Sequence, residues 1–238
     1  MSAVDKLLEP GEAIARSLFD GAVVMVGGFG LVGKPLTLVT ALNASAVRGL
    51  TVVSNNLGEP GRYLGRTLQL GKIRRAVGSF FTSNPEAVRA HTEGRLEVTL
   101  LPQGTFAEAL RAGGAGLGGF YTPTGVGTLL AEGKKVREIG GRAFLFQEAL
   151  TADVALVRAR RADRLGNLTY SGTARNFNPL MAAAAPAADE DAAIAESLAQ
   201  MLRAARTVIS DNQARIDDAD VGHPIHERAV EQECLPGP

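Results

Sequence analysis

Short apolar segments rich in β-branched residues alternate along the chain with stretches whose apolar residues recur at helical spacing. The segments that read as strands are residues 22–26, 50–54, 72–80 and 96–101. Alternation of this kind is typical of β-α-β units, in which each helix covers a face of a parallel sheet. The pattern therefore predicts an α/β fold, with a mainly parallel sheet flanked by helices.

Proline and capping residues predict where the helices begin. Three helices are expected to start at Lys34–Pro35, Pro60–Gly61 and Asn84–Pro85, because the missing N–H of proline costs nothing in the first turn. A fourth should follow Gly104, where Thr105 and Glu108 have the spacing of a T-x-x-E capping box.

Glycine marks the turns of the second half of the chain. Residues 113–128 hold seven glycines among sixteen positions, which predicts a long loop. Residues 135–139 and 142–147 flank Gly140–Gly141, the signal of a two-residue hairpin. Residues 153–159 read as another buried strand, and Gly166–Asn167 as a turn.

The composition shifts at about Ala182, where the alanine-rich segment A-A-A-A-P-A-A-D-E-D-A-A begins. Beyond it, apolar residues keep helical spacing, so one helix is possible over residues 191–209, followed by an irregular tail. We therefore expect one domain over residues 1–185 and an atypical C-terminal segment over residues 186–238.

Composition limits the partners that the protein can have. Lys plus Arg and Asp plus Glu number 25 each, so no strong field favours nucleic acid or an anionic membrane. The single cysteine and three histidines follow no metal-ligand spacing, and we expect no metal. No apolar run approaches the length of a membrane span. These features favour a cytoplasmic protein that handles small molecules.

The segment after the first strand contains a G-x-G-x-x-G at Gly28 to Gly33. A dinucleotide site also needs an acidic residue at the end of the next strand, where this chain has Asn55–Asn56. An NAD-dependent dehydrogenase is therefore disfavoured. A plain tight turn is one alternative, and a site for an anionic or thioester ligand is the other, since glycines let a ligand approach backbone N–H groups. Phe29 is either a lid over that ligand or a core anchor.

Amide side chains follow two of the predicted strands. Asn55 and Asn56 come after the second strand, and Gln103–Gly104 after another, at the edge where open α/β sheets bind ligands. Ordinary turn chemistry for the asparagines and a helix-entry role for the glutamine are the alternatives. No G-x-S-x-G, phosphate loop or Cys–His pair accompanies them. The chain has half of a binding site and lacks a nucleophile of its own.

These segments together resemble a known family. Residues 20–35 follow the pattern D-G-x-x-(apolar)₃-G-G-F-x-x-x-G-x-P of family I CoA-transferase A subunits. Further landmarks agree in order: S-N-N-L-G at 54–58, P-Q-G-T-F-A-E at 102–108, the glycine-rich stretch 113–134, and L-G-N-L-T-Y-S-G-T-A-R-N-F-N-P-L-M-A at 165–182. The resemblance covers residues 20–182.

The resemblance implies a CoA-transferase-like fold, related to sugar-phosphate isomerases, and an A subunit that works with a B subunit in a hetero-oligomer such as A2B2. CoA would move between a short-chain acyl-CoA and a carboxylic or 3-oxo acid by a ping-pong mechanism, with a glutamate nucleophile that belongs to the B subunit. The S-E-N-G segment that carries this glutamate is absent from the chain. Coenzyme A would be a substrate, and no permanently bound cofactor is expected.

The resemblance also implies roles for individual residues. The CoA-binding loop would be Gly27, Gly28, Phe29, Gly30, Leu31, Val32 and Gly33. Asn55, Asn56, Gln103 and Gly104 would position the acyl group and the partner's glutamate, and no catalytic residue is expected in this chain. The stretches at 83–86 and 116–120 look closest to acetate and acetoacetate enzymes, with succinate or 3-oxoadipate enzymes next.

The C-terminus departs from the family's pattern. After residue 182 the usual apolar strand, acidic stretch and T-P-G segment are not visible, which predicts either a diverged helix or a shift of reading frame near Ala185. The alternative function is a non-catalytic domain of the same fold that senses a sugar phosphate or an acyl-CoA.

Overall fold

A computed structural model of the chain describes residues 8–163, 166–185 and 193–197. The chain divides into a compact unit of residues 1–201, which contains every described element, and a second unit of residues 202–238. The domain boundary expected after residue 185 stays a prediction.

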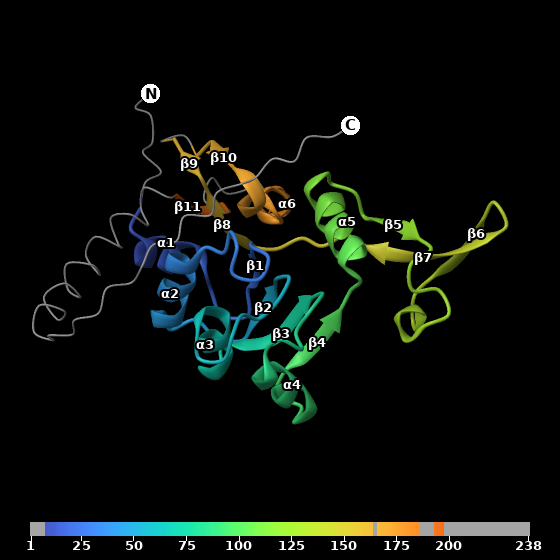
Figure 1. The fold of residues 1–238 in the computed structure, drawn as a ribbon, viewed down its shortest axis with the longest axis horizontal. Coiled ribbons are helices and arrows are strands. Elements are labelled where there is room, and N and C mark those ends of the chain that lie inside the picture. The colour runs from blue at the N-terminus through green and yellow to red at the C-terminus, as the bar shows by residue number, and fades with distance from the viewer. Residues whose placement is uncertain (1–7, 164–165, 186–192, 198–238) are drawn as a thin grey trace, which may run out of the picture. The chain divides into compact units, whose positions relative to one another are not determined.

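The centre of the first unit is a six-stranded sheet in the order β11-β8-β1-β2-β3-β4, drawn in Figure 1. Its strands are β1 (Val23–Val26), β2 (Leu50–Val53), β3 (Ile73–Gly78), β4 (Glu97–Leu100), β8 (Val154–Ala159) and β11 (Ala193–Ser197). All five neighbouring pairs are parallel. The mainly parallel sheet expected from the sequence is therefore confirmed.

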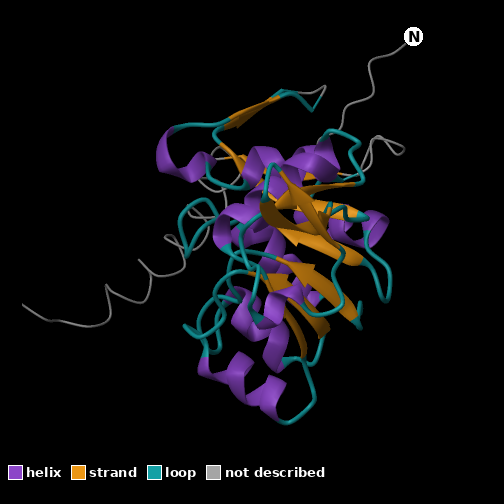
Figure 2. Cartoon of the chain, turned by 90° about the vertical axis from the view of Figure 1, so that its right-hand side faces the viewer, coloured by secondary structure: helices purple, strands orange, loops and turns teal. Residues whose placement is uncertain are grey.

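Helices cover both faces of this sheet, as Figure 2 shows. The chain order supplies α1 (Pro10–Ser17), α2 (Leu36–Ala44), α3 (Tyr63–Gln69), α4 (Pro85–Thr92), α5 (Gln103–Gly114) and α6 (Asn178–Ala184). Alternate residues of β1 belong to two separate cores: Val24 and Val26 pack with residues of α1 to α4, whereas Met25 packs with residues of α5 and α6. A strand buried on both faces is mostly apolar, which is why β1 is entirely apolar and Thr51 is the one polar residue of β2.

A three-stranded antiparallel sheet in the order β5-β7-β6 follows α5 in the chain. Its strands are β5 (Gly119–Thr122), β6 (Val136–Ile139) and β7 (Arg142–Glu148), and η1 (Leu129–Ala131) lies between β5 and β6. The predicted hairpin is confirmed: Ile139 pairs with Arg142, and Gly140 and Gly141 have φ of +59° and +74°. Two glycines at positive φ are what a two-residue turn of this type requires.

A short hairpin and a 3-10 turn lead from the sheet to α6. The antiparallel pair β9 (Arg161–Ala162) and β10 (Leu168–Thr169) precedes η2 (Gly172–Arg175). The backbone N–H of Gly166 donates to the carbonyl oxygen of Asp163 at 3.2 Å, which agrees with the turn expected at Gly166–Asn167.

Two of the four predicted helix starts need correction. α4 begins at Pro85 with Asn84 as its cap, as expected, and α2 follows Pro35. However, α3 begins at Tyr63 and not at Pro60–Gly61, because Gly58 and Gly61 hold a loop with φ of +66° and +73°.

The capping box predicted at the start of α5 is wrong. The helix begins at Gln103, directly after Pro102, so Thr105 and Glu108 lie inside it. Thr105 is buried, and Glu108 forms an ion pair with Arg111 one turn later at 2.7 Å. The prediction failed because Pro102, and not Thr105, is the N-cap residue of the helix.

The long loop predicted at residues 113–128 is wrong in part. α5 runs on to Gly114, and β5 occupies Gly119–Thr122. These glycines serve close packing: a Cβ on Gly113 would lie 2.0 Å from the carbonyl oxygen of Leu150, and one on Gly119 would lie 2.4 Å from that of Gln147. A glycine count predicts a loop, yet here glycine allows backbones to approach.

The helix predicted over residues 191–209 is wrong for residues 193–197, which form β11; the rest of it lies outside the described residues. β11 pairs in parallel with residues 155–159 of β8. Pairing with the open edge of β8 satisfies backbone groups that an edge strand leaves unpaired, and this outweighs the helical spacing of the apolar residues.

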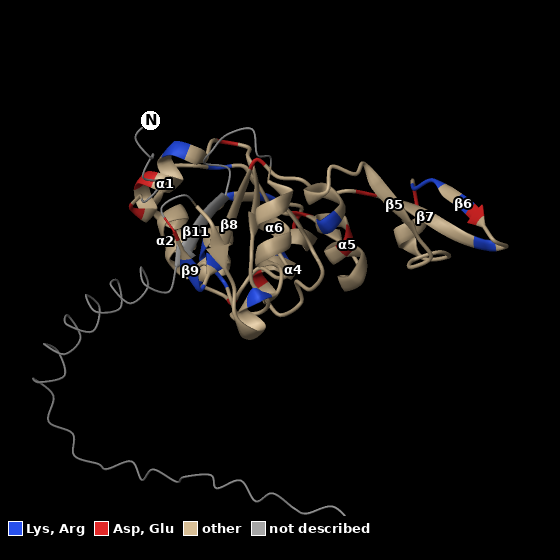
Figure 3. Cartoon of the chain, turned by 90° about the horizontal axis from the view of Figure 1, so that it is seen from above, with Lys and Arg blue, Asp and Glu red and all other residues tan. Residues whose placement is uncertain are grey.

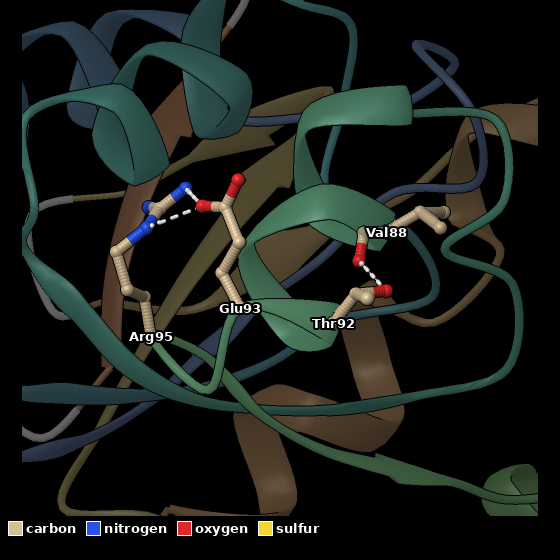
Figure 4. A network of polar contacts seen from close by, with 4 residues as sticks. All are labelled: Val88, Thr92, Glu93 and Arg95. Carbon is tan, nitrogen blue, oxygen red and sulfur yellow. Dashed lines mark hydrogen bonds and ion pairs between the residues drawn. The ribbon is translucent and has the colours of Figure 1, made fainter.

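Charged residues of both signs are scattered over the elements in Figure 3. Figure 4 enlarges the end of α4 and the residues that follow it. Arg95 donates to Glu93 at 2.8 Å, and Thr92 donates to the carbonyl oxygen of Val88 at 3.1 Å. Exposed pairs of this kind contribute little to stability. Within the described ranges, no helix is long and apolar enough to cross a membrane, and no cluster of side chains could hold a metal ion.

Candidate functional site at the carboxyl edge of the sheet

The predicted site residues lie where parallel strands end. Residues 27–33 follow β1, Asn55 and Asn56 follow β2, and Gln103 follows β4. Because these strands run parallel, their carboxyl ends lie at one edge of the sheet, which is where open α/β sheets bind ligands. β1 and β2 are neighbours, and β3 alone separates β2 from β4.

The glycine-rich segment forms a tight hairpin turn. Phe29 and Val32 exchange backbone hydrogen bonds of 2.9 and 3.0 Å, with Gly30 between them at φ +58°. Within the described part of the chain, the backbone N–H groups of Gly28, Gly30, Leu31 and Gly33 have no acceptor. Unpaired backbone N–H groups are strong donors, so the turn is equipped to receive an anion or a carbonyl oxygen.

The expectation that the glycines make room for a ligand needs correction at three positions. A Cβ on Gly27 would lie 2.0 Å from Oδ1 of Asn178, one on Gly28 2.3 Å from Cγ of Lys34, and one on Gly33 2.4 Å from the carbonyl oxygen of Ala174. The space beside these three glycines is filled by the protein itself. Only Gly30 of the motif faces open space, so an approaching ligand would meet the turn at Gly30.

The segment Asn176–Phe177–Asn178 holds the turn in place. Asn176 donates to the carbonyl oxygen of Val32 at 3.0 Å, and the buried Asn178 donates to that of Gly33 at 2.9 Å. Oδ1 of Asn178 accepts from the backbone N–H of Arg158 in β8 at 2.9 Å, which ties the turn to the sheet. In the sequence, N-F-N is a landmark of the resemblance, and its position there does not indicate this role.

Aromatic rings connect the turn to α5. Phe29 stacks on Phe177 with ring centroids 6.4 Å apart, and Phe177 meets Phe106 edge-on at 5.3 Å. Phe29 is half exposed, so the alternative that it is a core anchor is wrong. Its role as a lid stays a prediction.

Asn56, Asn55 and Gln103 form a chain of hydrogen bonds that we call the amide relay. The backbone N–H of Gly58 donates to Oδ1 of Asn56 at 3.0 Å, Nδ2 of Asn56 donates to Oδ1 of Asn55 at 3.2 Å, and Nδ2 of Asn55 donates to Oε1 of Gln103 at 2.9 Å. The relay spans β3 at its carboxyl end, where the N–H of Phe80 donates to the carbonyl oxygen of Asn55 at 3.1 Å.

The relay has a fixed polarity. A backbone N–H can only donate, so Oδ1 of Asn56 must be the atom that faces Gly58. The Nδ2 group of each asparagine then donates to the side-chain oxygen of the next amide. The last member, Gln103, is exposed and accepts through its oxygen, which leaves its Nε2 donors facing outward. The first backbone N–H groups of α5, at Gln103 and Gly104, add donors at the same place. The arrangement presents donors to an oxygen atom of a ligand.

Lys34 lies beneath the turn, at a position for which the sequence predicts only the start of a helix. Its side chain is completely buried, and its Nζ donates to Oγ of Ser54 at 3.1 Å. Ser54 in turn donates to the carbonyl oxygen of Val26 at 2.9 Å. Burial lowers the pKa of Lys34 from 10.5 to about 7.

A pocket of about 440 Å³ adjoins the start of α5. Pro102, Gly104, Thr105 and Glu108 line one side of it, and residues of β5 line the other. Of the predicted site residues, Gly104 reaches this pocket, whereas residues 27–33 are not among its lining. Gln103, Asn55 and Asn56 are not among the lining residues either, although Pro102 and Gly104, the two neighbours of Gln103 in the chain, are.

Known proteins are similar to this chain in sequence. The chain is similar to the A subunit of the succinyl-CoA:3-ketoacid coenzyme A transferase of Xanthomonas campestris, with 52% identity over 172 residues, or 72% of this chain and 71% of that protein. It is similar to the alpha subunit of the acetate CoA-transferase of Escherichia coli, with 49% identity over 70% of this chain and 76% of that protein.

A solved structure, the acyl-CoA transferase apoenzyme of Escherichia coli O157:H7, superposes with a TM-score of 0.64 at 22% identity. The superposition covers 71% of this chain and 37% of that longer chain, and it shows the fold. Residues 8–220 match the family described as Coenzyme A transferase. The match extends past residue 182, where the resemblance of the sequence motifs ends. Because the family model matches most of the chain, this chain belongs to the coenzyme A transferase family.

Proposed function

We propose that this chain is the A subunit of a two-subunit CoA-transferase, which moves CoA between a short-chain acyl-CoA and a carboxylic or 3-oxo acid. The amide relay carries the proposal, because it ends in N–H donors at the carboxyl edge of the sheet, and among the described residues no carboxylate bonds any of its members. An oxygen-binding site without a carboxylate nucleophile fits a reaction whose attacking glutamate belongs to a second subunit.

The proposed chemistry is covalent. A glutamate that belongs to the B subunit is the nucleophile for the thioester carbonyl; the C–S bond breaks, and CoA leaves as a thiolate with an acyl-glutamyl anhydride remaining on the enzyme. The thiolate then attacks the glutamyl carbonyl and releases the first acid. The second acid reverses both steps. Each attack places negative charge on a carbonyl oxygen, which the outward N–H donors of Gln103 and Gly104 would stabilise.

The turn at residues 27–33 is assigned to CoA in this proposal. Its unpaired N–H groups suit phosphate or carbonyl oxygens, and the exposed apolar side chains of Phe29, Leu31 and Val32 suit the uncharged parts of CoA. Asn55 and Asn56 are buried and would position the acyl group by orienting Gln103. The A2B2 arrangement and the cytoplasmic location belong to the same proposal.

Complementation tests the proposal. The isolated chain is expected to show no transfer between succinyl-CoA and acetoacetate, and activity should appear when a CoA-transferase B subunit is co-expressed and co-purified with it. Borohydride reduction after incubation with acyl-CoA should label only the B subunit. Turnover by the isolated chain would contradict the assignment to a two-subunit enzyme. Binding of a sugar phosphate by the isolated chain, without affinity for acyl-CoA in the complex, would favour the sensing domain instead.

Substitution of Gly30 tests the assignment of the turn. Gly30→Ala adds a methyl group that points into open space at φ +58°, so it should cost about 1 kcal/mol of folding stability. The same methyl group should obstruct CoA and raise KM for acyl-CoA about tenfold, equivalent to about 1.4 kcal/mol, with a smaller effect on kcat. Steady-state kinetics of the assembled enzyme measure both.

Gly71→Ala is the matched control, because Gly71 has φ +66°, faces open space and lies before β3 at the opposite edge of the sheet. It should lose similar stability and keep its KM. If the Gly30 and Gly71 variants have the same KM for acyl-CoA, CoA does not bind at the turn.

A further inference from the structure

Lys34 occupies the space between the two halves of the candidate site. Its side chain packs under Gly28 of the turn, where an added Cβ would meet Cγ of Lys34 at 2.3 Å. Its amine bonds Oγ of Ser54, the residue directly before the amide relay. The two segments are neighbours because β1 and β2 are adjacent in the sheet. A charge on Lys34 therefore acts on both the turn and the start of the relay.

The surroundings of Lys34 contain no compensating charge. Residues 27–44 carry no ionisable side chain other than Lys34, and residues 54–56 carry none. Arg175 and Arg158 lie on the segments that support the turn, and neither changes the pKa of Lys34, which is lowered by burial alone. An ammonium has three donors, and Ser54 is the one acceptor that Lys34 has among the described residues. Lysine at such a position holds an unsatisfied positive charge, or gives up its proton.

We propose that Lys34 is an electrostatic positioning residue of the site: it takes up a proton when an anionic ligand occupies the turn, and its buried ammonium then stabilises that ligand without touching it. The inference rests on the proposed function, since it assumes that an acyl-CoA or its CoA product binds at residues 27–33.

Linkage gives the sign of the effect. A negative ligand favours the charged form of Lys34, so binding raises its pKa above about 7. Well below pH 7 the lysine is charged with and without ligand, and the attraction is fully present. As the pH rises through the raised pKa of the complex, the lysine becomes neutral and the attraction is lost. If binding raises the pKa by one unit, the complex takes up about half a proton at pH 7.5, and affinity falls about tenfold over the alkaline range.

The test measures proton uptake when coenzyme A binds to the assembled A and B subunits. Calorimetric titration at pH 7.5 in buffers of different ionisation enthalpy gives the number of protons bound. The wild-type complex should take up about half a proton more than the Lys34→Met complex. Protons that belong to CoA itself cancel in this difference. The dissociation constant of the wild-type complex should also rise about sevenfold between pH 6.5 and pH 9, and that of Lys34→Met should change less.

Lys72→Met is the matched control. Lys72 is also buried, but it bonds the carbonyl oxygens of Ser45 and Val47 and lies before β3, at the amino edge of the sheet. Its variant should retain the wild-type uptake. Equal uptake by the wild-type and Lys34→Met complexes would overturn the inference, as would a pH-independent dissociation constant in the wild type. If the wild-type complex does not bind coenzyme A at all, the proposed function fails and the inference fails with it.

Discussion

Replacing Gln103 with leucine is expected to lower kcat of the assembled enzyme by about 10²–10³-fold, since the variant loses the outward N–H donors of the amide relay. The loss of one donor to a developing oxyanion costs about 2.7–4 kcal/mol of transition-state stabilisation. The expected fall in kcat exceeds any rise in KM, because charge on the carbonyl oxygen develops only as the glutamate attacks. Initial rates with succinyl-CoA and acetoacetate give both constants.

The fold should survive this substitution. Gln103 is exposed at the first position of α5, and its side chain makes one hydrogen bond among the described residues, from Asn55. Gln69→Leu is the matched control, because Gln69 is an exposed glutamine at the end of α3 that bonds Glu86 at 2.6 Å, away from the carboxyl edge. Both variants should melt within a few degrees of the wild type. If kcat of the Gln103→Leu enzyme is within about twofold of the wild type, the amide relay does not contribute to catalysis.

The relay illustrates what the sequence could predict about the site. Asn55, Asn56 and Gln103 were identified because each follows a predicted strand, and strand ends at one edge of a parallel sheet are brought together by topology. The bonds among them were not predictable, since Asn55 and Gln103 are 48 positions apart and meet only because β4 pairs with β3. The polarity of the relay depends on the backbone N–H of Gly58, which no residue pattern reveals.

For the glycines, the sequence led to a wrong interpretation. A glycine-rich turn suggested that missing Cβ atoms make room for a ligand, whereas Asn178 and Lys34 fill the space beside Gly27 and Gly28. Both interpretations predict the same residue type, and only the three-dimensional neighbours separate them. The same holds for Gly113, where close packing on Leu150 continues a helix in a stretch that the glycine count predicts as a loop.

The strands of the sheet were predictable because strands buried on both faces are mostly apolar: β1 is entirely apolar, and β2 and β8 have one polar residue each, Thr51 and Arg158. β11 was not, because its residues Ala193–Ser197 are alanine-rich and fall on a helical spacing. Its conformation follows from the unpaired edge of β8, a long-range contact that local propensity cannot anticipate.

Replacing Lys34 with methionine is expected to stabilise the folded chain at neutral pH. Methionine is similar in length and fills the space under Gly28 without an amine to desolvate. Replacing buried ion pairs with apolar residues of similar volume is often neutral or stabilises by about 1–4 kcal/mol, and we expect a gain within this range for the buried, unpaired Lys34. In a domain of this size each kcal/mol raises Tm by about 2–4 °C. Ser54 loses one donor and keeps its bond to the carbonyl oxygen of Val26, so the cost of the exchange is small.

The pH dependence of this gain identifies its cause. Burial lowers the pKa of Lys34 to about 7 in the folded chain, against 10.5 for an exposed lysine. Between these two values the unfolded chain binds more protons than the folded chain, so this group makes the wild type more stable as the pH rises. Its penalty is complete below pH 7 and vanishes above pH 10.5. Urea unfolding should therefore find Lys34→Met more stable than the wild type at pH 6.5, with the difference largely gone by pH 10.

Lys72→Met is the control for this measurement as well. It should lose stability at both pH values, because it leaves the carbonyl oxygens of Ser45 and Val47 without their donor. A Lys34→Met chain that is less stable than the wild type at pH 6.5, or equally displaced at both pH values, would show that the amine is well solvated or well paired. A stabilised variant that also loses proton-linked CoA binding would mean that the buried lysine is kept for the site at the expense of the fold.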